Sequence, residues 1–232
     1  MKSQIFLWNR SAIAMLLAPF VLVSSALAGP PLICHSLDIG DAKSIPWTSH
    51  DWNLTGSENY NMKNLAADTT AILDSDSSVL VHMETLRRAT LYARKDPVAA
   101  KQLATKLVVR ADASANSKAA AMASFDLGYL AECYRQWMGK DEPNPAQGLD
   151  GYGLVKKAMQ LRGKDPQMDF AAALITLNGP AGEHQDYVQK TLAGAKTDAL
   201  LARNLFTHFM GPQSETMADM ISRTAAVKVA KQ

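Results

Sequence analysis

The amino-acid sequence predicts an all-α fold of antiparallel helical hairpins, preceded by an extended N-terminal arm. Two observations carry this prediction. Apolar residues recur at helical spacing in successive segments between residues 62 and 210, and short polar turns rich in Gly, Pro and Asp separate those segments. Residues 29–61 show no sustained period of 2 or 3.6, so we expect loops or extended chain there.

Residues 1–28 have the parts of a secretory signal peptide. Lys2 and Arg10 form a basic beginning, residues 13–23 are apolar but short for a bilayer span, and residues 26–28 read Ala-Leu-Ala, a cleavage signal. A retained membrane anchor is the alternative, which Pro19 and the cleavage signal disfavour. We therefore expect export to the bacterial periplasm or beyond, with no stable membrane insertion after cleavage.

The charge balance narrows the classes of partner. Lys and Arg number 24 and Asp and Glu 22, but Lys2 and Arg10 lie in the predicted signal, so the remaining chain is neutral. Such a balance does not point to nucleic acid, to an anionic membrane or to an acidic substrate. The predicted organisation is a signal peptide, an arm, one helical domain and a flexible or partly helical tail, over residues 1–28, 29–61, 62–210 and 211–232.

Three aromatic residues mark the arm: Trp47, Trp52 and Tyr60. Exposed rings in an exported protein can form a platform for sugars or peptides. An arm without its own core also needs aromatic side chains to dock on a folded body, and we favour this interpretation.

The helical domain contains seven or eight predicted helices. They cover residues 62–73, 79–94, 97–111, 117–138, 150–162, 167–177, 183–195 and 198–210. Asn61 can cap the first of them. Asp96–Pro97 and Asp165–Pro166 each suit a helix start, because Asp accepts hydrogen bonds from free amides and Pro has no amide to lose.

Two of these helices are expected to be buried. Residues 117–138 are apolar on two faces, so this helix should have neighbours on two sides and form the centre of the fold. Residues 167–177 are apolar nearly all round. Residues 139–149, with two prolines and two glycines, are predicted to form a surface loop.

The two cysteines, Cys34 and Cys133, lie in the arm and in the predicted central helix. An oxidising compartment favours one disulfide between them, which would close a loop of about 100 residues. Two independent thiols, with Cys133 in the core and Cys34 exposed, are the alternative.

The Lys-Asp-Pro triplets at residues 95–97 and 164–166 lie about two 34-residue tetratricopeptide periods apart. Residues 158–166 resemble the end of a tetratricopeptide B helix, and Leu127–Gly128 resembles the Leu-Gly pair of an A helix, although Ala131 stands where that pattern has Tyr. The resemblance implies tetratricopeptide-like or α-solenoid-like packing, with a concave surface for a peptide or partner helix.

A second resemblance lies in the arm. Residues 30–35 read Pro-Pro-Leu-Ile-Cys-His, and the run continues with Asp-Ile-Gly at 38–40, Ala-Lys-Ser at 42–44 and Pro-Trp at 46–47. This run resembles the N-terminus of a group of uncharacterised secreted bacterial proteins. The resemblance implies export and nothing about chemistry.

Four arm and helix residues follow the order of metal ligands in the all-α HD phosphohydrolases: His35, His50, Asp51 and Asp68. That chemistry needs a His-Asp pair held rigidly on a helix, whereas His50–Asp51 lies in the arm. The sequence contains no Gly-x-Ser-x-Gly elbow, Gly-rich phosphate loop or His-Glu-x-x-His motif. We expect no cofactor or metal, and a metal-dependent hydrolase is the second hypothesis.

Binding is the function that the pattern favours. Six basic residues cluster on the expected first hairpin and could meet a carboxylate or an acidic peptide: Arg87, Arg88, Arg94, Lys101, Lys106 and Arg110. A solvated face is the commoner meaning of such charges. The first hypothesis is an exported interaction or scaffold module with a protein or peptide partner and no catalytic activity.

Overall fold

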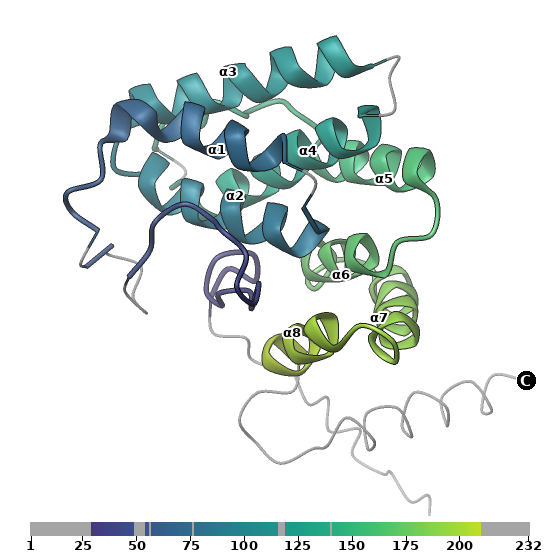
Figure 1. The fold of residues 1–232 in the computed structure, drawn as a ribbon. Helices are drawn as coiled ribbons and strands as arrows, with labels where there is room; N and C mark the ends of the chain where they lie inside the picture. The colour runs from purple at the N-terminus through teal and green to yellow at the C-terminus, as the bar shows by residue number, and fades with distance from the viewer. Residues whose placement is uncertain are drawn as a thin grey trace, which may run out of the picture.

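The fold is an all-α array of helical hairpins with an N-terminal arm, as predicted (Figure 1). The computed structural model describes residues 29–48, 54–55, 57–75, 77–115, 119–139 and 141–209. In these ranges a short 3-10 turn, η1 (Met62–Asn64), and eight helices occur, and there is no strand. The helices are α1 (Leu65–Leu73), α2 (Val79–Ala93), α3 (Pro97–Ser114), α4 (Ala120–Trp137), α5 (Gly151–Arg162), α6 (Pro166–Ile175), α7 (Ala181–Ala195) and α8 (Ala199–Phe209).

The two Asp-Pro dipeptides begin α3 and α6, which confirms the sequence prediction. Asp96 accepts hydrogen bonds from the amides of Val98 and Ala99 at 2.9 and 3.1 Å. Asp165 does the same for the two amides that follow Pro166, at 3.0 and 3.4 Å. Each carboxylate thus satisfies amides that have no partner within the helix.

Helix α4 is the central helix of the fold, as its two apolar faces predicted. It packs against α2 and α3 and makes its most extensive contact with α5. Gly128 of α4 lies directly on the start of α5, where a Cβ would come within 2.6 Å of the Gly151 carbonyl oxygen. This glycine therefore sets the short distance between the two helices.

Helix α2 is the most completely enclosed of the described helices. All of its residues except Arg88 are buried, although it carries several charged and polar side chains. It packs more extensively on α4 and α1 than on α3, so α2 and α3 do not form the expected first hairpin. Each face of α2 therefore meets other parts of the chain.

The arm covers one face of α2 and reaches α8 (Figure 1). Among its described residues it buries six aliphatic side chains: Leu32, Ile33, Leu37, Ile39, Ile45 and Leu54. The amide of Leu37 donates to Glu84 Oε2 at 2.9 Å, and the amide of Asp38 donates to Asn204 Oδ1 of α8 at 2.8 Å. The arm is thus part of the core that joins the two ends of the helical array.

Helices α5 and α7 run in the same direction on either side of α6. Near one end, the Tyr152 hydroxyl of α5 donates to Glu183 Oε1 of α7 at 2.5 Å and lies within hydrogen-bond distance, 3.1 Å, of the Tyr187 hydroxyl. At the other end, Gly194 of α7 packs on Pro166, the first residue of α6. Helix α6 packs against both helices, and its residues 168–174 are all buried. Within the described ranges, no helix combines the length and apolar character that a membrane span requires.

Candidate functional site

The six basic residues of the predicted peptide-binding face do not form one exposed surface. Four of them are ion-paired: Arg87 and Arg88 with Glu84, Arg94 with Glu142, and Arg110 with Asp74 and Asp126. Lys101 and Lys106 are exposed on α3. The prediction of one basic face is therefore wrong, because it assumed that α2 has a solvated side, whereas the arm covers that side.

Glu84 is the centre of a buried polar cluster that holds the arm on α2. Its two oxygens accept hydrogen bonds from Arg87 Nε and Nη2 at 2.7 and 2.9 Å, and Arg88 Nε donates to Oε1 at 2.7 Å. Nη1 of each arginine donates to an arm carbonyl, Arg87 to Ile33 at 3.1 Å and Arg88 to Ile45 at 2.9 Å. A buried ion pair with this many partners is structural, because each charge is already compensated.

Both cysteines are free thiols, so the predicted disulfide between Cys34 and Cys133 is not formed. Burial raises the pKa of both thiols, most strongly that of Cys133 in the packed interior of α4, and the charge of Arg87 opposes the shift in each. The Cys34 sulfur lies against Gly29, where a Cβ would come within 2.3 Å of it. Cys133 lies in the core, as in the alternative of two independent thiols, whereas Cys34 is half-buried and not exposed.

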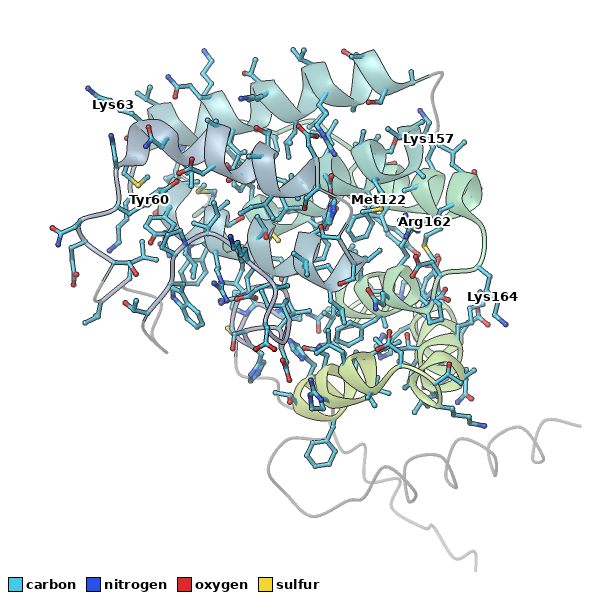
Figure 2. All side chains as sticks on the ribbon, viewed as in Figure 1. Tyr60, Lys63, Met122, Lys157, Arg162 and Lys164 are labelled. Atoms are coloured by element: carbon cyan, nitrogen blue, oxygen red, sulfur yellow. The ribbon has the colours of Figure 1, made fainter. Side chains whose placement is uncertain are left out.

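Two of the predicted docking aromatics lie against the helical body. The Trp47 ring lies 4.5 Å from the guanidinium carbon of Arg87. Tyr60 packs its ring on Tyr92 of α2 with 4.7 Å between centroids, and its hydroxyl donates to Asp68 Oδ2 at 2.7 Å (Figure 2). Both rings therefore contact α2.

The residues of the predicted metal set do not meet within the described ranges. Three predicted site residues lie outside those ranges: His50, Asp51 and Trp52. The His35 ring packs edge-on against His208 of α8, while Asp68 accepts the hydrogen bond from Tyr60. Among the residues that the structure describes, no group of three or more His, Cys, Asp or Glu could hold a metal ion.

A second buried polar cluster joins α2, α3 and α4. His82 Nδ1 and Asp126 Oδ1 lie 2.7 Å apart, and Arg110 Nη1 donates to Asp126 Oδ2 at 2.6 Å. A carboxylate in this position orients the histidine in hydrolytic triads. Here His82 and Asp126 are both buried among three helices and Arg110 also pairs with Asp74 of the α1–α2 turn, so the cluster ties the helices together.

A groove of about 650 Å³ lies over the beginning of α6, between α5 and α7. Lys156 and Met159 of α5 line one side, Tyr187 and Lys190 of α7 line the other, and Asp169 of α6 lines the space between them. The Tyr152–Tyr187 hydrogen bond joins α5 and α7 beside this groove. The groove is thus formed by three consecutive helices of the array.

Asp169 is the distinctive residue of the groove. It is 6% exposed and lines the groove, and within the described part of the chain its carboxylate makes no hydrogen bond or ion pair. Burial raises its pKa to about 6; Lys190 and Lys164 oppose this shift, and Asp165 and Asp186 add to it. The carboxylate opens on the groove, so it is largely but not completely removed from water, and a carboxylate in such a place without a protein partner is uncommon because its partial desolvation is not compensated by a donor.

Two lysines of the groove, Lys190 and Lys156, are engaged with neighbouring side chains. Lys190 Nζ pairs with Asp186 Oδ2 at 2.6 Å and lies 5.3 Å from the centroid of the Tyr187 ring. Lys156 Nζ lies 4.4 Å from the centroid of the Tyr152 ring. The two sides of the groove thus combine aromatic faces with cations, whereas the Asp169 carboxylate has no hydrogen-bond or ion-pair partner in the described structure.

Asp169 is not among the site residues predicted from the sequence, although the sequence contains a signal for it. The predicted buried helix contains one carboxylate, which stands between Met168 and Phe170. A charge on a helix that is apolar nearly all round must be paired, coordinated or functional.

No match to the chain was found among models of protein families, among curated proteins or among solved structures.

Proposed function

We propose that this chain is an exported binding protein, which holds an extended segment of a partner protein or peptide in the groove between α5 and α7. The observation that supports this proposal is the buried, unpaired carboxylate of Asp169 in that groove. An ionised carboxylate that is partly removed from water lowers the stability of the fold unless a donor compensates it. A ligand that donates a hydrogen bond to Asp169 offsets this loss of stability, so the burial of the carboxylate favours binding of such a ligand.

Binding is favoured over catalysis by the state of the neighbouring groups. Asp165 accepts two backbone hydrogen bonds and pairs with Arg162, and Asp186 pairs with Lys190. General acid-base chemistry on two carboxylates needs a second group that is free to exchange a proton. A recognition site needs one unsatisfied acceptor and a surface of suitable shape.

Export is the second part of the proposal, and it rests on the signal-like residues 1–28. Expression of the full chain in a bacterial host, followed by intact-mass measurement of the periplasmic protein, tests it. A mass that begins at Gly29 is the expected result. Retention of residues 1–28 in the membrane fraction would contradict export as a soluble protein.

Selection of peptides from a random display library on the purified protein tests the binding function. The selected peptides are then titrated against the wild type and against Ala193→Trp, a change at an exposed residue of α7 that lines the groove. The indole fills part of the groove without disturbing the core, so affinity should fall by about tenfold or more.

Ala113→Trp is the matched control, because Ala113 is an exposed alanine on α3 that does not line the groove. This variant should bind the selected peptides as the wild type does. Failure of the selection to yield any binder, or equal affinity of Ala193→Trp and the wild type, would contradict a peptide-binding groove at this position.

A further inference from the structure

The charges around Asp169 come from all three helices of the groove, and none of them makes a direct hydrogen bond or ion pair with its carboxylate in the described structure. The groups that face it are Lys156 of α5, Lys164 of the α5–α6 connection, Asp165 of α6, and Asp186 and Lys190 of α7. Lys164 projects from the outer edge of the connection (Figure 2). None of the three lysines lies within ion-pair distance of Asp169 in the described structure.

Lys190 shows which chemical group this surface accommodates. Its ammonium pairs with Asp186 at 2.6 Å and lies 5.3 Å from the Tyr187 ring, so a cation is held between a carboxylate and an aromatic face. The side chain is half exposed and lies at the groove. Cations are favoured over aromatic faces, and more so where water is partly excluded. Asp169 lies in the same groove and lacks such a cation.

We propose that the ligand is a peptide segment whose lysine or arginine side chain enters the groove between Lys156 and Lys190 and pairs with Asp169. This inference rests on the proposed binding function. Charge complementarity selects this ligand, because the vacant counterpart of a buried carboxylate is a cationic hydrogen-bond donor. An acidic ligand would instead bring a second negative charge next to Asp169, Asp165 and Asp186.

The dimensions of the groove favour a peptide over a free small amine. A volume of about 650 Å³ exceeds that of one basic side chain, and the lining runs from Lys156 to Gly163 on one side and from Asp186 to Ala193 on the other. Met159 and Tyr187 offer apolar contact beside the carboxylate. An amine alone would leave these contacts unused, whereas a peptide segment covers them with its backbone and flanking residues.

The matched-peptide experiment compares a selected peptide that contains arginine with the same peptide containing citrulline, which keeps the shape and loses the charge. On the wild type, the arginine peptide should bind about tenfold or more tightly, as expected for a charge-assisted hydrogen bond in a buried site. On Asp169→Asn the two peptides should bind alike. A lysine peptide and its acetyl-lysine form provide the second pair.

Asp186→Asn is the control variant, because it removes a carboxylate of the same groove that already has a cation. It should keep most of the difference between the arginine and citrulline peptides. Thermal unfolding of Asp169→Asn verifies that this variant is folded, so a loss of discrimination cannot be ascribed to unfolding.

The affinity of the arginine peptide should also depend on pH. Asp169 must be ionised to pair with a cation, so affinity should fall as the pH drops below about 6 and be level above it. The citrulline peptide should show a much smaller change. Two results would overturn this inference and leave the proposed function standing. One is a peptide without any basic residue that binds in the groove, shown by its loss of affinity for Ala193→Trp. The other is a preference for arginine over citrulline that persists in Asp169→Asn.

Discussion

Asp169 shows how one residue can oppose the stability of the fold that contains it. In the unfolded chain an Asp has a pKa near 3.9, whereas burial raises the pKa of Asp169 to about 6. The folded state therefore binds a proton more tightly than the unfolded state between these two values. Stability must fall as the pH rises through this window, and the loss is complete above about pH 6.

Replacement Asp169→Asn should stabilise the protein at pH 7.5 and have little effect near pH 4, where the carboxyl group is protonated in the folded state. The expected gain is roughly 1–3 kcal/mol, from a shift of about two pKa units at 1.36 kcal/mol each. Urea unfolding at the two pH values measures it. A variant that is less stable than the wild type at pH 7.5 would show that Asp169 has a stabilising partner in solution.

Arg87 and Arg94 are two arginines with the same kinds of neighbour and different burial. Arg87 lies over Trp47 and pairs with Glu84 in the interior, whereas Arg94 lies over Trp137 and pairs with Glu142 at the surface. Their chemistry is matched and their solvation differs, which separates the effect of burial from that of the contacts themselves.

Arg87→Ala should destabilise the fold by roughly 3–5 kcal/mol, because it leaves the buried carboxylate of Glu84 with fewer donors and removes the bond to the arm. Arg94→Ala should cost less than about 1 kcal/mol. Urea unfolding gives both values, and limited proteolysis should cut residues 29–48 faster only in Arg87→Ala. Equal effects of the two changes would argue against a buried attachment of the arm.

At the scale of single elements, Gly128 decides how closely α4 and α5 approach. A Cβ at this position would lie 2.6 Å from the Gly151 carbonyl oxygen and 2.9 Å from the Val155 amide nitrogen. Both neighbours belong to the backbone, so they cannot turn away as a side chain could. The Leu-Gly pair that resembles a repeat motif in the sequence thus has a specific packing role here.

Gly128→Ala should destabilise the fold by about 1–3 kcal/mol or more, because α5 must move away from α4 to admit the methyl group. Gly182→Ala in α7 is the control, since a Cβ there meets no atom within 4 Å. That change should be neutral or stabilise by up to about 1 kcal/mol through helix propensity. Chemical unfolding measures both, and a Gly128→Ala protein as stable as Gly182→Ala would exclude the close helix contact.

At the scale of elements, the sequence predicted which segments are helical more reliably than which helices are buried. The starts of α3 and α6 follow from Asp96–Pro97 and Asp165–Pro166, because capping depends on residues a few positions apart. The burial of α2 did not follow, since charged residues such as Glu84 and Arg87 are normally solvated. Their burial depends on carbonyl and amide groups of the arm, which are distant in sequence.

The whole molecule depends on the arm, although the sequence of the arm shows no helical or strand period of its own. Hydrogen bonds from the arm reach α2 through Leu37 and α8 through Asp38, so the chain closes on itself near its two described ends. The face of α2 is consequently occupied by the arm, and the predicted basic surface is absent from it. The groove over α6 is formed instead by α5 and α7, where the arm does not line the opening.

The sequence by itself determined the all-α class, the main helices with two of their caps, and the burial of α6, because helical periodicity and capping are local properties of the chain. Tertiary structure alone decided which charges are enclosed and paired, that the two cysteines remain thiols, and that Asp169 lies unpaired in a groove. These features depend on contacts between residues far apart in sequence. The residues next to a carboxylate in the sequence are the same whether or not a cation pairs with it in the folded protein.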